Sequence, residues 1–168
     1  YDLTFGSREW RLLDAGRITR REANERMLER ARAVGRGFEV EGVLDDWMSM
    51  LHPRRRMQTL VEQLKQRGYC VYYLSNIPED VLDLLMHRDF EGLFDGGVAS
   101  CEVKVNKPDP RIYQALLDKY HLRADECIFI DDRADNLVAA SALGFGTYEM
   151  HGVGTLLRSL PTFGVSLH

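Results

Sequence analysis

Apolar residues recur along this chain at two different spacings, which separate a helical first part from a mixed second part. Thr19–Glu22 is a capping-box pattern, and small and apolar residues follow it at helical spacing as far as Ala31. Val43–Leu51 carries a second apolar stripe of the helical kind. We predict that residues 1–51 form helices and that both stripes are packing surfaces rather than cofactor sites.

The second part of the chain alternates between strand and helix patterns. Short runs rich in apolar, aromatic and β-branched residues predict four strands, at Tyr69–Leu74, Gly97–Cys101, Cys127–Ile130 and Phe145–Met150. Helical patterns lie between them, and one begins at Asp109-Pro110, an N-cap followed by a proline at the first helical position. Helices between strands favour parallel pairing through right-handed crossovers. The expected fold class is therefore α/β with a doubly wound parallel sheet, divided into residues 1–51 and 52–168.

Composition narrows the class of protein. The 168 residues are 45% hydrophobic, which suits one globular domain with a small appendage. A net charge of −4 offers no basic field for nucleic acid, and no apolar run is long enough to span a membrane. Three cysteines without metal-type spacing favour buried thiols in a reducing compartment, so we expect a cytoplasmic protein. The oligomeric state is left open.

Acidic residues follow the third predicted strand. Asp131 and Asp132 come directly after Phe129-Ile130, at the carboxyl end where open α/β sheets bind their ligands. Two adjacent carboxylates suit a hard cation such as Mg²⁺, which takes oxygen ligands and helps to bind phosphate. An acidic turn before a helix is the ordinary alternative, because aspartate favours such positions.

Polar side chains also follow the first two predicted strands. Ser75 and Asn76 end the first, and Lys107 lies in a proline-flanked turn after the second. Taken alone, these are turn residues and a solvated charge. In a parallel sheet, however, the carboxyl ends share one edge, so a hydroxyl, an amide, a cation and an acidic pair would converge. That set suits phosphoryl transfer, which depends on positioning and charge neutralisation.

Three motifs in this order resemble the haloacid dehalogenase-like (HAD) superfamily. They are Leu74-Ser75-Asn76, then Asn-Lys-Pro-Asp-Pro-Arg-Ile-Tyr at 106–113, then Phe-Ile-Asp-Asp-Arg-Ala-Asp-Asn at 129–136. The form is similar to that of bacterial sugar-phosphatase-like members and of the phosphatase domain of epoxide hydrolases. The resemblance covers about residues 52–150, and residues 5–51 resemble the later part of a helical cap. It implies a Rossmann-like core with a partial cap.

The resemblance also implies roles for the phosphate-binding residues. Ser75 would bind phosphoryl oxygens with Asn76 beside it, and Lys107 would neutralise the nucleophile and the phosphate. The first motif of the family, an Asp-x-Asp that supplies the nucleophile and the acid/base group, does not occur here. In the family it ends a strand at the centre of the sheet. We therefore expect a longer natural protein whose upstream stretch supplies that strand.

The segment 129–136, which matches the fourth motif of the family, implies the metal site. Asp131 and Asp132 would hold Mg²⁺, with Asp132 the better candidate for direct coordination, and Asn136 would brace them from behind. The expected function of the complete protein is Mg²⁺-dependent hydrolysis of phosphomonoesters of small metabolites through an aspartyl-phosphate, with the 168-residue chain alone inactive. The alternatives are a degenerate binding or regulatory module and, less favoured, a haloacid dehalogenase.

Overall fold

The computed structural model describes residues 1–52 and 54–167, and the chain divides into two compact units. Unit 1 comprises Tyr1–Pro53, Ser75–Phe90 and Ala99–Asn106, and unit 2 comprises Arg54–Leu74, Glu91–Val98 and Lys107–His168. The division at residues 51 and 52 that the sequence suggests stays a prediction, because unit 1 also takes two segments from the second part of the chain.

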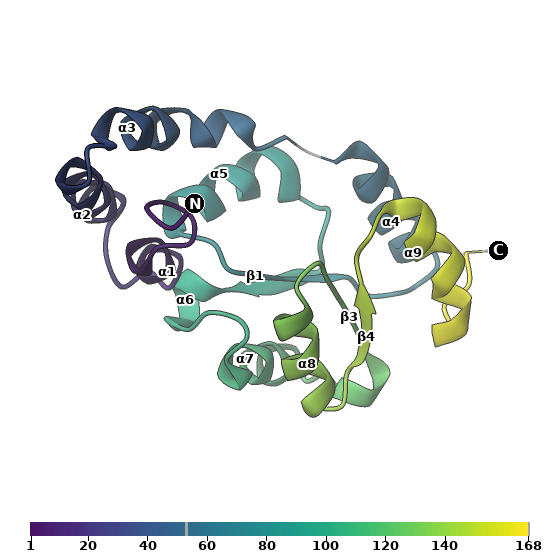
Figure 1. The fold of residues 1–168 in the computed structure, drawn as a ribbon. Helices are drawn as coiled ribbons and strands as arrows, with labels where there is room; N and C mark the ends of the chain where they lie inside the picture. Colours follow the sequence, from purple (N-terminus) through teal and green to yellow (C-terminus); the bar gives the residue numbers. More distant parts are fainter. Residues whose placement is uncertain (53, 168) are drawn as a thin grey trace. The chain divides into compact units, whose positions relative to one another are not determined.

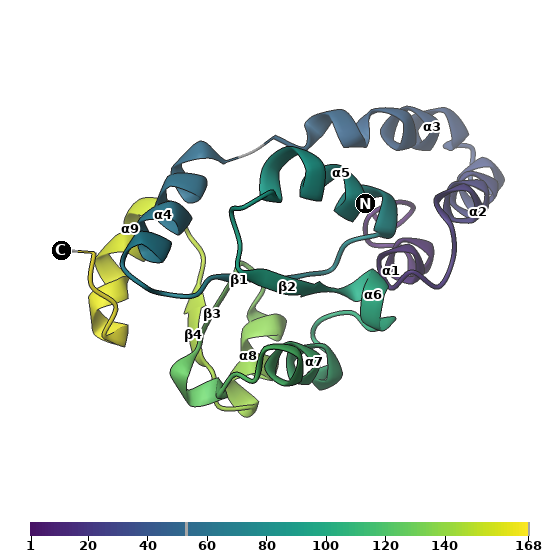
Figure 2. The same ribbon diagram turned by 180° about the vertical axis from the view of Figure 1, so that it is seen from behind.

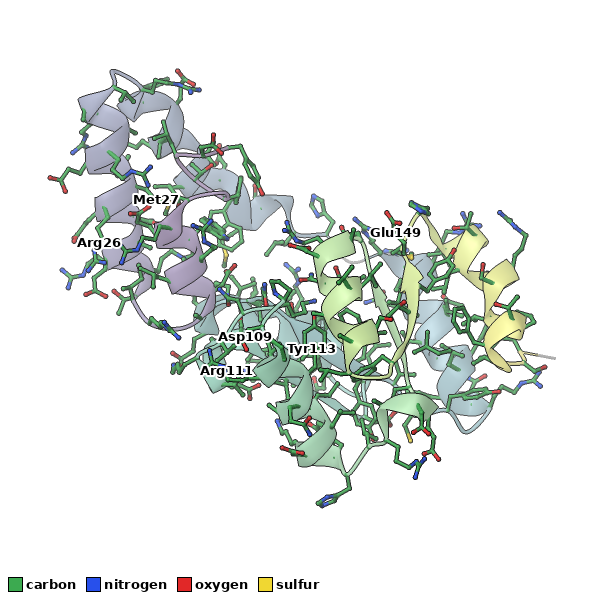
Figure 3. The ribbon with its side chains drawn as sticks, turned by 60° about the horizontal axis from the view of Figure 1, so that its bottom comes forward. Arg26, Met27, Asp109, Arg111, Tyr113 and Glu149 are labelled. Atoms are coloured by element: carbon green, nitrogen blue, oxygen red, sulfur yellow. The ribbon has the colours of Figure 1, made fainter. Side chains whose placement is uncertain are left out.

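Unit 1 is mainly helical (Figure 1). Its elements are α1 (Arg8–Asp14), α2 (Arg20–Ala33), α3 (Gly37–Asp46), η1 (Trp47–Met50), α5 (Glu79–Leu85), η2 (Met86–Phe90) and α6 (Ser100–Val103). The capping box predicted at the start of α2 is confirmed, since Thr19 Oγ1 accepts from the Glu22 N–H and Glu22 accepts from the Thr19 N–H. Met27 on the predicted stripe is fully buried, whereas the neighbouring Arg26 is exposed (Figure 3).

An arginine between two tryptophans links α1, α2 and α5. The rings of Trp10 and Trp47 meet edge to face with centroids 5.1 Å apart. The Arg20 guanidinium lies 4.5 Å from the Trp47 centroid, and Arg20 also pairs with Asp80 at 2.9 Å. Asp14 ends α1 beside this group, where burial raises its pKa to about 7, Arg20 acts to lower it and Asp80 raises it further.

The raised pKa of Asp14 predicts that replacing this residue stabilises the chain at high pH. The folded state holds the proton up to about pH 7, whereas the unfolded carboxyl releases it near its ordinary pKa of 3.8. Folding stability therefore falls as pH rises between these values. In urea titrations, Asp14→Asn is expected to raise the free energy of unfolding by about 2–4 kcal/mol at pH 8 and by much less at pH 4. A gain of equal size at both pH values would contradict the assignment.

Unit 2 contains the strands. Its elements are α4 (Arg55–Gln66), β1 (Tyr72–Ser75, of which Ser75 belongs to unit 1), β2 (Gly96–Ala99, of which Ala99 belongs to unit 1), α7 (Pro110–Tyr120), η3 (Ala124–Glu126), β3 (Ile128–Asp131), α8 (Ala134–Ala142), β4 (Gly146–Glu149), α9 (Val153–Ser159) and η4 (Leu160–Phe163). All four strands lie within a few residues of their predicted ranges. The N-cap at Asp109 with Pro110 at the first helical position is also confirmed.

Two expectations about the second predicted strand and the cysteines were wrong. The strand ends at Ala99, because Ser100 and Cys101 begin the short helix α6, whose Glu102 accepts the Ala99 N–H at 2.8 Å. Only Cys101 is buried, while Cys70 is exposed and Cys127 is intermediate. The helix opening expected at Pro53 lies outside the described residues.

Helices cover both faces of the strands of unit 2. Figures 1 and 2 show α7 and α8 on one face of β3 and β4, with α4 and α9 on the other. Leu60 of α4 packs with Leu156 and Leu160, and Ile130 of β3 lies against this cluster. On the opposite face, Tyr113 of α7 meets the Phe129 ring edge to face at 5.3 Å. Helices on both faces of strands are the arrangement of an α/β fold.

The strands of unit 2 form two separate pairs. β1 pairs with β2, and β3 pairs with β4 in parallel register, with Ile128 opposite Gly146 and Asp131 opposite Glu149. Among the described residues, no strand pairs with the second edge of β1 or of β3. The parallel register of β3 and β4 agrees with the parallel pairing that the sequence predicted. In the same described part of the chain, no helix has the length and apolarity that a membrane span requires.

Candidate active site

A buried lysine joins the carboxyl ends of β1 and β3. Lys107 follows the loop after α6, and its peptide bond to Pro108 is cis. Its Nζ donates to Asp131 Oδ2 at 2.7 Å and to the Leu74 carbonyl oxygen at 2.8 Å. The side chains of Lys107 and Asp131 are only 10% and 7% exposed. The geometry of such a desolvated pair is fixed. If the two side chains moved apart, each would be a buried charge without its partner.

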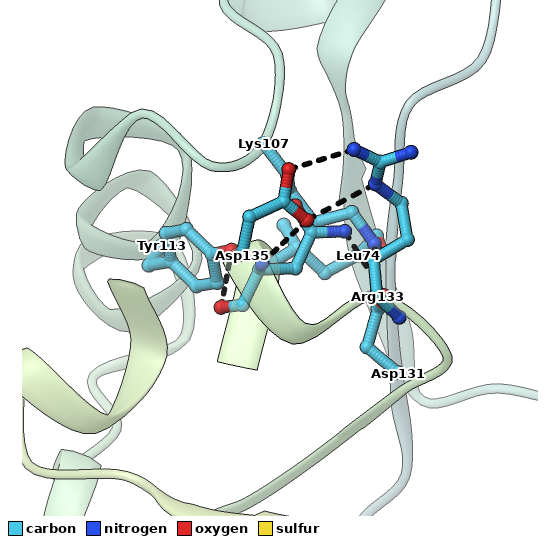
Figure 4. A network of polar contacts seen from close by, with 7 residues as sticks. Leu74, Lys107, Tyr113, Asp131, Arg133 and Asp135 are labelled. Carbon is cyan, nitrogen blue, oxygen red and sulfur yellow. Dashed lines mark hydrogen bonds and ion pairs between the residues drawn. The ribbon is translucent and has the colours of Figure 1, made fainter. Parts of the chain in front are cut away.

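The Asp131 carboxylate accepts hydrogen bonds from three residues. Besides Lys107, its Oδ1 accepts from the Arg133 N–H and from Asn136 Nδ2, both at 2.9 Å (Figure 4). Burial alone would raise the pKa of Asp131, but the hydrogen bonds from Lys107 and Asn136 outweigh it and lower the pKa. The carboxylate is therefore held ionised at neutral pH, as a charged acceptor between the strand and α8.

Asn136 is braced in turn by α7. It lies in the first turn of α8 and is 2% exposed, and its backbone carbonyl accepts from the Tyr113 hydroxyl at 2.9 Å. Its Oδ1 is buried and has no hydrogen-bond partner among the described residues. Asn136 thus orients Asp131 through its Nδ2 group, while its Oδ1 atom accepts no hydrogen bond from the described residues.

Asp132 differs from its neighbour, because its side chain is exposed at the end of β3. Among the described residues there is no group of three or more His, Cys, Asp or Glu side chains that could hold a metal. Mg²⁺ does not require one, since it commonly takes one or two carboxylates and completes its shell with water and phosphate. Asp131 already accepts three hydrogen bonds, so the donor set fits such an ion mainly through Asp132.

Ser75 and Asn76, the remaining predicted site residues, lie in unit 1. Ser75 is the last residue of β1 and directly follows Leu74, whose carbonyl accepts from Lys107. The structure brings together the side chains of Lys107, Asp131 and Asn136, with Asp132 adjacent in the chain. The functional roles assigned to all of these residues stay predictions.

Three contributors were missed by the reasoning from sequence. The Leu74 carbonyl and the Arg133 N–H are backbone groups, and backbone partners carry no residue-type signal. Tyr113 ends the segment 106–113 of the family resemblance and was given no role, although its place beside Ile112 on the helix indicated a buried side chain. A buried tyrosine hydroxyl needs a hydrogen-bond partner.

Comparisons with known proteins show the family of the chain. A family model described as haloacid dehalogenase-like hydrolase matches residues 4–144. The chain belongs to this family. It is 36% identical over 109 residues to a sesquiterpene phosphatase from Aspergillus oryzae, an alignment that covers 64% of this chain and 56% of that protein. The chain thus spans about half the length of this curated relative.

Solved structures of HAD enzymes share the fold. An HAD-like family hydrolase from Porphyromonas gingivalis has a TM-score of 0.75 at 25% identity, over 95% of this chain and 82% of that one. An HAD family enzyme from Bacteroides thetaiotaomicron, in complex with magnesium and inorganic phosphate, has a TM-score of 0.65 at 26% identity, over 87% and 77%. The fold of this HAD-family chain is therefore the HAD-like α/β fold, as its motifs predicted.

The buried pair predicts strong coupling between Lys107 and Asp131. Lys107→Met and Asp131→Asn are each expected to lower the free energy of unfolding by about 3 kcal/mol, because each leaves a buried charge without its partner. The double variant is expected to lose about 1–3 kcal/mol less than the sum of the two. Urea denaturation of the wild type, the two single variants and the double variant measures this.

The exposed pair of Arg123 and Asp125 provides the matched control. Its side chains are 68% and 64% exposed, so the corresponding variants should each change stability by less than about 1 kcal/mol. Additive losses at Lys107 and Asp131, of the same size as in this control, would show that the buried pair is not coupled.

Proposed function

We propose that the complete protein is an Mg²⁺-dependent hydrolase of phosphomonoesters of small metabolites. The observation that carries the proposal is the Lys107 ammonium, buried and held 2.7 Å from Asp131 at the ends of two strands, with the exposed Asp132 next in the chain. A fixed cation beside carboxylates that can hold a metal is suited to neutralising phosphoryl charge. The phosphatase relative and the magnesium–phosphate complex of an HAD enzyme support the same reaction class.

The residues of this chain have distinct tasks in the proposal. Lys107 stabilises the developing charge on phosphorus oxygens, and Ser75 and Asn76 bind phosphoryl oxygens. Asp132, oriented by the Asp131–Asn136 network, holds Mg²⁺ with help from Asp131. The bound ion supplies charge neutralisation of the phosphoryl group. An aspartate outside residues 1–168 attacks phosphorus and breaks its bond to the substrate oxygen, which leaves as the protonated alcohol. Water then cleaves the aspartyl-phosphate to inorganic phosphate and the free carboxylate.

The relatives of the chain indicate which phosphomonoesters to test. The Aspergillus oryzae relative is a sesquiterpene phosphatase, so a phosphate ester with an apolar body belongs in the substrate panel together with sugar phosphates and nucleotides. Carbon–halogen hydrolysis is a weaker candidate, because it has no use for an exposed carboxylate next to a buried, lysine-paired one.

The test is an assay of the complete protein with Mg²⁺ on this phosphomonoester panel. Turnover is expected, and Asp132→Asn is expected to lower kcat by at least about 100-fold, since it removes the main metal ligand. Addition of a chelator should abolish activity. The control is Asp125→Asn, which changes an exposed carboxylate of η3 and should leave turnover unchanged.

Two results would point to the other functions. Activity on a 2-haloacid that survives the chelator would identify a dehalogenase. Absence of turnover on every substrate, together with retained binding of Mg²⁺ and phosphate in calorimetry, would identify a binding or regulatory module.

A further inference from the structure

An aromatic ring lies against the buried ammonium of Lys107. The Lys107 Nζ atom is 5.3 Å from the centroid of the Phe129 ring, within the range of an attractive cation–π contact. The same atom donates to Asp131 Oδ2 at 2.7 Å and to the Leu74 carbonyl oxygen at 2.8 Å. The ammonium is therefore held by a carboxylate, a carbonyl and an aromatic ring.

The spacing along β3 explains why the ring and the carboxylate contact the same lysine. Phe129 and Asp131 are two residues apart in the strand, so their side chains leave the same face of β3. Ile130 lies between them and points to the other face, where it packs against the cluster of Leu60. A lysine that pairs with Asp131 on this face is thereby brought against the ring two residues earlier.

The Phe129 ring is held by two other aromatic side chains. It meets the Tyr113 ring edge to face with centroids 5.3 Å apart, and the Phe145 ring with centroids 6.4 Å apart. Tyr113 and Phe145 also meet edge to face, so each ring contacts the other two. All three side chains are buried. A ring packed in this way keeps its face towards the ammonium.

Burial determines how much this contact contributes. The Lys107 side chain is 10% exposed and Phe129 is 8% exposed, so little water competes for the ammonium. A desolvated cation–π contact is stronger than one at the surface. An aliphatic side chain could fill much of the same volume, but it has no π-electron face to attract a charge.

From these contacts we infer that Phe129 is a positioning residue, which acts through Lys107 by holding its ammonium over a fixed aromatic face. The ring blocks displacement of the ammonium along β3 towards the interior, and the two hydrogen bonds hold it at the strand ends. The contact itself does not depend on the proposed function. Its consequence for catalysis rests on that function, in which Lys107 stabilises charge on phosphoryl oxygens.

Fluorination of the ring tests the contact with little change of shape. Mono-, di- and trifluorinated phenylalanine at position 129 withdraw progressively more of the π-electron density that attracts a cation. In urea titrations of the chain, the folding equilibrium constant is expected to fall stepwise, by about fivefold for the trifluorinated form. In the Lys107→Met background the same series should change it by less than about twofold, because no ammonium faces the ring.

Phe145 provides the matched control. It is 6% exposed and packs on the same two rings, and in the described part of the chain no cation lies over it. Its fluorinated series should change the folding equilibrium constant by less than about twofold with Lys107 present. This comparison needs no Lys107 variant, so it decides the question even if Lys107→Met does not fold. Equal steps at positions 129 and 145, or equal steps at position 129 with and without Lys107, would make Phe129 a packing residue only.

The complete protein tests the catalytic consequence. Trifluorination of Phe129 is expected to lower kcat by about threefold or more and to change KM much less, because the position of the ammonium matters most in the transition state. The same change at Phe145 should leave kcat unchanged. A kcat that does not respond at position 129 would overturn the positioning role. If the parent protein hydrolyses no phosphomonoester, the proposed function fails, while the folding series still decides the contact.

Discussion

One buried ammonium group holds together the part of this protein where chemistry is expected. Lys107 bonds the end of β1 through the Leu74 carbonyl and the end of β3 through Asp131. Among the described residues these two strands have no hydrogen-bonded ladder between them, and Lys107 links their carboxyl ends. Removing both charges from water is costly, and such pairs are weak contributors to stability. Their value lies in fixing where a charge points.

The same network gives two adjacent carboxylates different environments. Asp131 is buried, ionised and saturated with donors from Lys107, Arg133 and Asn136. Asp132 is exposed and keeps its oxygens accessible. In the proposed function, the exposed Asp132 carboxylate would give Mg²⁺ oxygen ligands that it can reach, while Asp131 keeps the end of β3 in place. Asn136, which donates to Asp131, is held in turn by the Tyr113 hydroxyl of α7. The site therefore depends on the packing of α7 and α8.

The apolar layer against β3 is the second constraint. Leu60 of α4, Leu156 of α9 and Leu160 of η4 form an apolar cluster, and Ile130 of β3 packs against it. This layer fixes one face of β3 and thereby the position of Asp131 at its end.

Periodicity and end signals in the sequence were sufficient for the local structure. The capping box at Thr19, the buried Met27 stripe and the Asp109-Pro110 helix start all involve residues close together in the chain, so their energetics are local. The motif order also identified the family, because the spacing of three strand ends is fixed by the fold. Ser100 and Cys101 were misassigned because a four-residue helix turn has no period to detect.

The tertiary structure alone decided which groups meet. A sequence does not show that Lys107 bonds the Leu74 carbonyl, 33 residues away, or that Tyr113 reaches the Asn136 backbone, because these partners are brought together by packing. It also does not distinguish the environments of Asp131 and Asp132, which are neighbours of one type. The two carboxylates differ in burial and in hydrogen-bond donors because of the way the end of β3 packs beside the start of α8. Residue types and spacing thus determined the family and the list of candidates, while desolvation and hydrogen-bond geometry determined what each candidate can do.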